Sequence, residues 1–256
     1  MPRIEDEYLE CAIYMYETKS DAEDSKDEGA TGFIVGAESP PPIKVSYYAV
    51  TNTHVIRDGF TVIRVNTREG GHDVIEVPRD SWISHPLDDV SVCPIEPMLA
   101  RHKSRYVRTA SFLSEGLVNN YDIGPGDEVF MVGRFMGLQG TLTNLPIARF
   151  GAISMLPREE IENPIGNRTK HFLVEVRSIS GFSGSPVFVY DTVPHNSKRA
   201  TTFGPTLLGV DCGHFPSGSS MIKGGIAPVV PAWRISEVIR SAEITEARKK
   251  MEGKNP

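Results

Sequence analysis

The chain has 256 residues, of which 39% are hydrophobic and 23% charged, a composition that fits a globular protein of one or two domains and excludes a wholly disordered chain. Its 27 Lys and Arg against 33 Asp and Glu give a net charge of −6, so no general attraction to nucleic acid or anionic lipid is expected. No run of about 18 apolar residues is present, and charges interrupt the opening segment MPRIEDEYLECAIYMYE. We therefore expect no membrane span and no export signal, and we predict a cytoplasmic protein.

Cysteine is scarce and odd in number, with only Cys11, Cys93 and Cys212. This argues against a disulfide framework and suits a reducing compartment. The stability of the protein is therefore expected to come from its hydrophobic core.

The first half of the chain holds short β-branched and aromatic runs between Gly, Pro, Asn and Asp residues, a pattern that predicts strands rather than long helices. An acidic segment, 20–28 (SDAEDSKDE), is predicted to be a solvated loop. The strands predicted in this half are 10–18, 31–36, 44–51, 61–65, 73–77 and 90–94.

The second half repeats this number of strands. They are predicted at 128–132, 141–155, 172–176, 186–190, 206–212 and 221–229. Only the C-terminal segment has a helical pattern: Pro231 suits a first turn, and an apolar stripe follows at Ile235, Val238, Ile239 and Ala242. We expect this helix to pack on the second β unit.

These elements predict an all-β fold of two six-stranded antiparallel β-barrels with a C-terminal α-helix, because closure removes the exposed edges of such sheets. The predicted division has four parts. They are a first barrel at 1–105, a linker at 106–124, a second barrel at 125–230, and the helix with its tail at 231–256.

The segment 178–188, SISGFSGSPVF, carries the strongest chemical signal, because Ser183 lies among small residues directly before an apolar strand. A nucleophilic hydroxyl needs a tight turn that presents its oxygen, with nearby backbone N–H groups free to face an oxyanion. Gly181 permits the backbone angles of such a turn, and the N–H groups of Gly181 and Ser183 would be the two donors. The alternative is a plain Gly/Ser turn that leads into a core strand.

Two further segments supply a base and an acid. His54 follows an apolar strand in SYYAVTNTHVI, at a position that suits a cleft, whereas the other histidines have polar or loop surroundings. Asp89 opens the alternating run that follows it in HPLDDVSVCP, where an acid can accept from a histidine ring N–H and fix its tautomer. Asp88 is the alternative acid, but the alternation favours Asp89, which is in phase with Ser91.

His, Asp and Ser occur in this order, the first two in the first β unit and the last in the second. On these residues the chain resembles the chymotrypsin-like (trypsin-fold) serine proteases, and most closely the bacterial HtrA/DegP-type and glutamyl-endopeptidase-type members. The resemblance spans nearly the whole chain. It also rests on TGFIV at 31–35, GDEV at 126–129 with VG at 132–133, LLGV at 207–210 and GIAP at 225–228.

The resemblance implies a serine endopeptidase with His54 as base, Asp89 as its orienting acid and Ser183 as nucleophile, while Gly181 and Ser183 supply the oxyanion donors. Such an enzyme needs no cofactor and no metal. Its partners would be a polypeptide substrate and, where the site is gated, an activating protein. Phe182 replaces the aspartate that digestive members carry before the nucleophile, so their activation by a new N-terminus is not expected. About 20 residues follow the last predicted strand, and we expect no PDZ domain.

For the substrate pocket, the resemblance points to Arg177 at its floor, with Asp211 and His214 near its wall. An arginine facing the pocket would favour an acidic residue before the scissile bond. In the alternative, Arg177 pairs with Asp211 or points to solvent. For the whole chain, the alternative to an active protease is a protease-like binding module, catalytically silent or gated by a partner.

Overall fold

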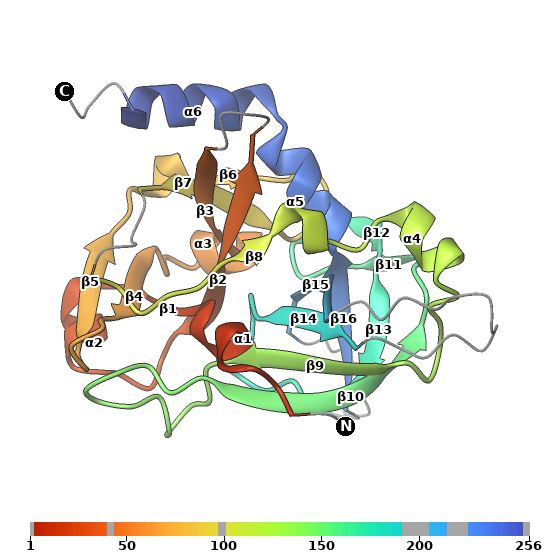
Figure 1. Cartoon of the computed structure of the whole chain (residues 1–256), viewed down its shortest axis with the longest axis horizontal. Coiled ribbons are helices and arrows are strands. Elements are labelled where there is room, and N and C mark those ends of the chain that lie inside the picture. Colours follow the sequence, from red (N-terminus) through yellow and green to blue (C-terminus); the bar gives the residue numbers. More distant parts are fainter. Residues whose placement is uncertain (1–2, 40–43, 97–100, 191–204, 214–224, 253–256) are drawn as a thin grey trace.

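Two β units lie side by side, the first coloured red to yellow and the second green to blue (Figure 1). The computed structural model describes residues 3–39, 44–96, 101–190, 205–213 and 225–252. His214, predicted near the pocket wall, lies outside these residues. No helix in the described ranges has the length and apolar character needed to cross a membrane.

The first unit is a single eight-stranded sheet. Seven of its strands follow the order β5-β4-β1-β2-β3-β7-β6, and β8 pairs in parallel with β2. The predicted closed six-stranded barrel is not confirmed here, because no ladder within the described residues joins the outer strands β5 and β6, and β6 is only two residues long. The strands are β1 (Ala12–Tyr16), β2 (Ala30–Glu38), β3 (Val45–Thr51), β4 (Val62–Asn66), β5 (His72–Glu76), β6 (Ile83–Ser84), β7 (Ser91–Ile95) and β8 (Val107–Arg108).

The second unit is the closed six-stranded barrel that the sequence predicts, in the order β10-β13-β16-β15-β14-β9. A separate two-stranded hairpin, β11 (Glu160–Glu162) with β12 (Arg168–Lys170), is inserted between β10 and β13. The barrel strands are β9 (Glu128–Gly133), β10 (Ile147–Met155), β13 (Phe172–Glu175), β14 (Pro186–Val189), β15 (Thr206–Asp211) and β16 (Ile226–Pro231).

Short helices fill the connections, and the sequence pattern does not reveal them because a helix of five or six residues is too short for a period of 3.6 to register. One of them, α2, overlaps the start of the acidic segment 20–28, which is therefore not a simple loop. It begins after Thr18, whose side chain accepts the N–H of Asp21 at 3.1 Å. They are α1 (Asp6–Glu10), α2 (Lys19–Glu23), α3 (Thr53–Arg57), α4 (Glu115–Asn120) and the 3-10 helices η1 (Arg79–Ser81) and η2 (Thr109–Ser111).

The segment predicted as a linker, 106–124, is structured and belongs to both units. Its first residues form β8, which extends the first sheet, and Leu113 donates its N–H to the carbonyl of Leu207 in the barrel at 2.9 Å. Helix α4 then leads into β9. The chain therefore crosses between the units along a folded path.

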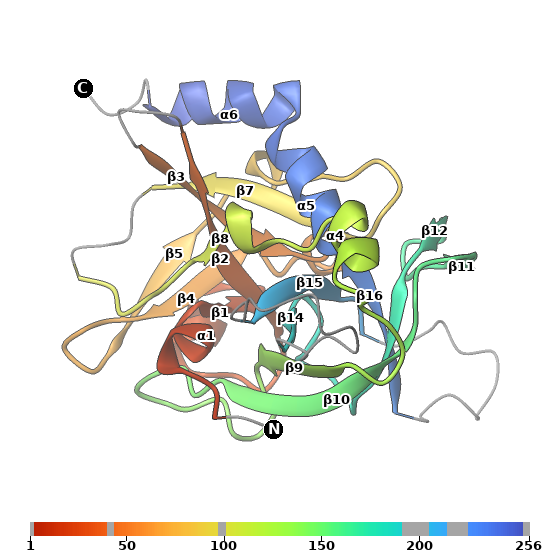
Figure 2. The ribbon, with the colours of Figure 1, turned by 45° about the vertical axis from the view of Figure 1, so that its right-hand side comes forward.

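Each end of the chain packs on the unit formed by the other half of the sequence, as both views show (Figures 1 and 2). Near the N-terminus, the Tyr8 ring in α1 packs edge-on against Phe130 and Phe188 of the barrel, at centroid distances of 5.6 and 5.1 Å. The C-terminal helix divides into α5 (Ala232–Ile239) and α6 (Ala242–Glu252). As expected, α5 packs on the second unit, against β15 and β16, but the helix also reaches the first sheet, where Arg248 of α6 donates to Ser46 Oγ at 3.1 Å.

Candidate active site

His54 lies in α3, directly after β3, and Asp89 lies in the turn before β7. Two contacts join them: His54 Nδ1 is 2.6 Å from Asp89 Oδ2, and the His54 backbone N–H donates to Asp89 Oδ1 at 2.9 Å. The Asp89 side chain is fully buried, whereas 21% of the His54 side chain is exposed. A histidine whose Nδ1 faces a carboxylate holds its proton there, which leaves Nε2 free to act as a base.

The pairing of β3 with β7 brings these two residues together, because Thr51 at the end of β3 lies opposite Ser91 at the start of β7. Buried polar contacts also join the end of β3 to the start of β7, beside the His54–Asp89 pair. The side chain of Asn52 donates to the backbone carbonyl of Asp89 at 2.8 Å, and Thr53 Oγ1 lies 3.1 Å from Ser91 Oγ. Asp89 is thus held through its backbone carbonyl as well as through its carboxylate oxygens.

Burial acts to lower the pKa of His54, but the hydrogen bond and the negative charge of Asp89 outweigh it, so the pKa lies above 6.5. The charges of Asp58 and Asp211 act in the same direction. His54 is therefore neutral, and able to accept a proton, only when the pH is above this raised pKa.

Ser183 lies in the turn between β13 and β14. Gly181 has φ +96° and Gly184 has φ +86°, in the region that favours glycine. Phe182, where digestive proteases carry an aspartate, is fully buried in the core of the second barrel. The buried Phe182 side chain thus holds the turn in the core directly before Ser183, whereas Ser183 stays partly exposed.

The Ser183 turn is bound to the first sheet through Thr31 in β2. The Thr31 backbone N–H donates to the carbonyl of Ser183 at 2.9 Å, and Thr31 Oγ1 donates to the carbonyl of Gly181 at 2.7 Å. The hydroxyl of Thr51 donates in turn to the carbonyl of Thr31 at 2.7 Å. Since Thr51 precedes His54 by three residues, these bonds bring the turn close to the end of β3 from which His54 follows.

Neither the N–H of Gly181 nor that of Ser183 has an acceptor within the described part of the chain. Two donors on the same turn are therefore free to bind an oxygen atom. No hydrogen bond joins His54 and Ser183. In unliganded enzymes this contact is often long and shortens only when substrate binds.

Asp88, the alternative acid, lies against helix α5. Its buried carboxylate is 3.0 Å from Arg234 Nε and 3.3 Å from His85 Nδ1. His85 Nε2 in turn lies 3.0 Å from Glu237 Oε2 on the same helix. The two adjacent aspartates therefore face different partners, Asp89 toward His54 and Asp88 toward the C-terminal helix.

The residues predicted for the substrate pocket do not gather in one place. Arg177 is exposed and lines an open cleft of about 620 Å³ with Arg149, Phe150 and Glu175. Asp211, by contrast, is fully buried at the end of β15 and accepts a hydrogen bond from Ser178 Oγ at 2.7 Å. Among the described residues, no ion pair joins Arg177 to Asp211.

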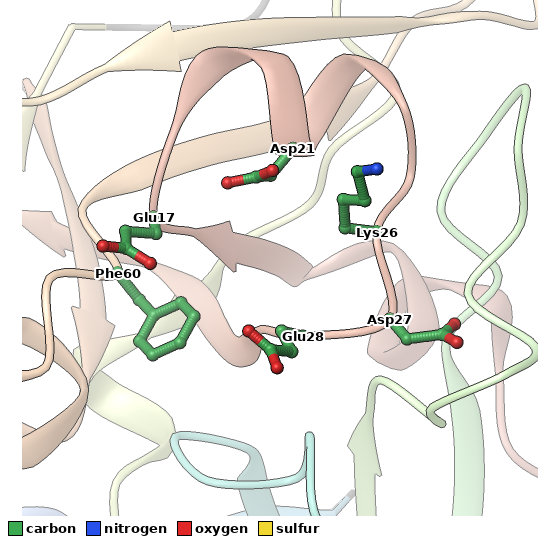
Figure 3. A pocket seen from close by; sticks show the side chains of 6 residues that line it. All are labelled: Glu17, Asp21, Lys26, Asp27, Glu28 and Phe60. Carbon is green, nitrogen blue, oxygen red and sulfur yellow. The ribbon is translucent and has the colours of Figure 1, made fainter.

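Sequence reasoning did not single out Asn52 or Ser178, although each lies within one of the segments that carry the predicted site. Their signal is a polar residue within an otherwise apolar or glycine-rich segment, which is weak until burial is known. It marked the acidic segment 20–28 but did not predict that this segment helps to form an acidic pocket of about 340 Å³, lined by Glu17, Asp21, Lys26, Asp27, Glu28 and Phe60 (Figure 3). No group of three or more His, Cys, Asp or Glu in the described ranges is arranged to hold a metal.

No protein-family model matches the sequence, and no curated protein matches it. The comparison with solved structures defines the fold: the two β units have the fold of chymotrypsin-like serine protease domains.

Solved structures show this likeness. The MamO protease domain from Magnetospirillum magneticum has a TM-score of 0.55 and 16% identity, covering 92% of this chain and 98% of that one. The active form of the Rv3671c protease from M. tuberculosis has a TM-score of 0.52 and 18% identity, and the match covers 90% of this chain and 80% of that one. The HtrA-type protease AlgW has a TM-score of 0.51 and 18% identity, and the match covers 85% of this chain and 52% of that one. At these identities the likeness establishes the fold.

Proposed function

We propose that the protein is a serine endopeptidase that hydrolyses peptide bonds through His54, Asp89 and Ser183. The observation that carries the proposal is the pair of contacts from His54 to the buried carboxylate of Asp89, close to a glycine-flanked turn that leaves Ser183 partly exposed. A base, its orienting acid and a hydroxyl on such a turn are the parts that nucleophilic hydrolysis requires.

In this mechanism His54 Nε2 takes the proton of Ser183 as the serine oxygen attacks a peptide carbonyl. The N–H groups of Gly181 and Ser183 donate to the oxyanion of the tetrahedral intermediate. His54 then gives its proton to the leaving amine, and an acyl-enzyme on Ser183 remains. A water molecule activated by His54 hydrolyses this ester and restores the serine.

The experiment is covalent labelling with a fluorophosphonate probe, followed by intact mass and peptide mapping. We expect one label per chain, at Ser183, and no label in Ser183→Ala. Ser180→Ala is the matched control, since Ser180 is an exposed serine of the same loop, and it should label. Turnover of a peptide substrate should fall about 10⁴- to 10⁶-fold in both Ser183→Ala and His54→Ala. Wild-type turnover in both variants would contradict the proposal.

A second function, that of a protease-like binding module, is favoured by one observation, the lack of a hydrogen bond between His54 and Ser183. In that function the fold binds polypeptides without cleaving them, or cleaves only when a partner closes this contact. Folded protein that fails to label, alone and with candidate partners, would support the binding module and exclude the enzyme.

A further inference from the structure

The turn that carries Asp89 is built around the ring of His85. Two backbone N–H groups of the turn donate to His85 Nδ1, that of Asp88 at 2.8 Å and that of Leu87 at 3.3 Å. The backbone N–H of His85 donates to the carbonyl of Val90 at 2.9 Å and closes the turn at its base. The ring therefore acts as the acceptor at the centre of the turn, and Asp89 directly follows the N–H that it binds.

The contacts of the ring determine where its proton lies. Because Nδ1 accepts the N–H of Asp88, it carries no proton, and the proton of the neutral ring lies on Nε2. Nε2 is 3.0 Å from Glu237 Oε2 in helix α5. Burial raises the pKa of Glu237, but hydrogen bonds from His85 and Arg234 outweigh it and lower this pKa, so the carboxylate is ionised at neutral pH. Glu237 therefore fixes the tautomer that the turn requires.

Arg234 joins these groups into a closed ring of four side chains. Its Nη1 lies 3.0 Å from each carboxylate oxygen of Glu237, and its Nε lies 3.0 Å from Asp88 Oδ2. Asp88 Oδ2 is also 3.3 Å from His85 Nδ1, and the charge of Arg234 offsets the repulsion between these two acceptors. His85 and Asp88 are buried, whereas the side chains of Arg234 and Glu237 are 28% and 46% exposed. Helix α5 thus holds the two side chains that support the Asp89 turn.

The position of Asp89 matters because its carboxylate contacts His54 twice, at 2.6 and 2.9 Å. Burial lowers the pKa of His54, but Asp89 raises it above 6.5 through its hydrogen bond and its charge. The charges of Asp58 and Asp211 act in the same direction. A turn that let the Asp89 carboxylate move away would therefore lower the pKa of His54 and leave the base without its orienting partner.

We propose that His85 is a positioning residue for the catalytic acid, and that helix α5 belongs to the site through Glu237. This rests on the proposed endopeptidase function and states how the same site is held in place. Nδ1 of His85 accepts the N–H of Asp88, and the turn fixed in this way directs the Asp89 carboxylate at His54. Glu237 keeps the ring in the tautomer that can accept.

The experiment is a pH titration of His54 by NMR in protein with isotope-labelled histidine, its signal assigned with His54→Gln. His85→Asn places an amide oxygen near the position of Nδ1, and should leave the His54 midpoint at the wild-type pH. His85→Gln can still donate to Glu237 but offers no acceptor at that position, and should move the midpoint to lower pH. A midpoint in His85→Gln equal to the wild-type value, or equal shifts in both variants, would overturn the proposal.

A second test uses Glu237, whose partly exposed side chain can be replaced without disturbing the core. Glu237→Gln keeps an acceptor for the His85 Nε2–H and removes the charge, whereas Glu237→Ala removes both. We expect only Glu237→Ala to lower the His54 midpoint. An equal shift in both variants would mean that the charge acts on His54 directly, and no shift in either would mean that α5 does not hold the ring. Each of these results would contradict the proposal.

His102→Gln is the control for the loss of a buried histidine. His102 Nε2 lies 2.7 Å from Asp73 Oδ2 in β5, the outer strand of the first sheet opposite β6. The variant should leave the His54 midpoint unchanged. A shift as large as that in His85→Gln would mean that any such loss loosens the site, and the specific role of His85 would be refuted.

Fluorophosphonate labelling of the same preparations separates this proposal from that of the endopeptidase. His85→Gln should label Ser183 about 10- to 100-fold more slowly than the wild type, and His85→Asn should recover most of the rate. Wild-type protein that labels, with one His54 midpoint in every variant, refutes the positioning role and leaves the endopeptidase standing. Folded wild-type protein that does not label refutes the endopeptidase, and the titration then still decides whether His85 positions Asp89.

Discussion

Gly184, the residue after Ser183, has a conformation and surroundings that exclude a side chain. Its φ is +86°, and a Cβ atom there would collide with the carbonyl oxygen of Thr31 and with Thr51 Oγ1. Since both atoms belong to the first sheet, the collision would push the Ser183 turn away from the strand that leads to His54. One missing methyl group thus permits the contact between the two β units at the site.

We expect Gly184→Ala to lower the free energy of unfolding by about 2–5 kcal/mol, from the positive φ together with the collision. Gly126→Ala is the matched control, because Gly126 has φ +99° but no atom within 4 Å of its Cβ position. The control should lose only about 1–2 kcal/mol. Urea unfolding of both variants gives the comparison, and equal losses would refute the role of the collision.

At the same scale, the sequence alone singled out His54, Asp89 and Ser183 because each stands in a local pattern of strand, turn and small residues. The sequence did not predict the surroundings of Asp211. Whether this carboxyl meets Arg177, solvent or Ser178 depends on which segments β15 lies beside, and that is set by pairings far apart in the chain. Local patterns single out candidate residues, whereas burial and partners follow from tertiary structure.

Among the elements, β2 connects the first sheet to the site through Thr31. The Thr31 hydroxyl donates to the carbonyl of Gly181 at 2.7 Å and accepts the backbone N–H of Arg134 at 2.9 Å. It therefore joins the candidate oxyanion turn to the segment after β9. The Arg134 side chain continues this connection, with its guanidinium over the Tyr16 ring at 4.5 Å and a hydrogen bond to the carbonyl of Glu28 at 2.9 Å.

Thr31→Val should lower the free energy of unfolding by about 2–5 kcal/mol. Valine has the same shape as threonine, but it leaves the buried N–H of Arg134 and the buried carbonyl of Gly181 without their hydrogen bonds. The loosened turn should also slow labelling of Ser183 about 10- to 100-fold at temperatures where the variant stays folded. Thr31→Ser retains the hydroxyl and should recover most of the labelling rate. Should Thr31→Val label as fast as the wild type, the hydroxyl would have no part in ordering the turn.

The sequence predicted the barrel strands well because β-branched runs between glycines and prolines are a local signal. It missed the hairpin β11–β12 and the short helices, whose few residues carry too little pattern. It also predicted closure of the first sheet. Closure depends on whether the two outer strands meet, and here β6 is too short to add a second ladder.

For the whole molecule, the crossed packing of the chain ends joins the stability of the two β units. One hydrophobic cluster contains Val50 and Val92 of the first sheet, Phe130 and Val210 of the barrel, and Ile235 of α5. Separating the units would expose this cluster to water. We therefore expect the units to unfold together.

The only two tryptophans test this, because Trp82 lies in the core of the first sheet and the Trp233 ring packs against Phe172 of the barrel at 5.8 Å. Trp82→Phe and Trp233→Phe each leave one fluorescent reporter. In each variant the urea midpoint from fluorescence should equal the midpoint from far-UV circular dichroism. A fluorescence midpoint well below the other, in either variant, would mean that one unit unfolds alone.

The three cysteines, one in β7 and two beside strand ends, are each 1% exposed, and burial raises the pKa of Cys11 and of Cys93 to about 12 and that of Cys212 as well. At pH 7 a thiol with a pKa of about 12, as in Cys11 and Cys93, holds about 10⁵-fold less thiolate than a thiol with a pKa near 7, so we expect the folded protein to react slowly with oxidants and alkylating agents. An unfolded chain exposes all three and becomes a substrate for oxidation. In an oxidising medium, an unfolded molecule can therefore be trapped by an intermolecular disulfide. The rate of unfolding then sets how long the protein stays functional.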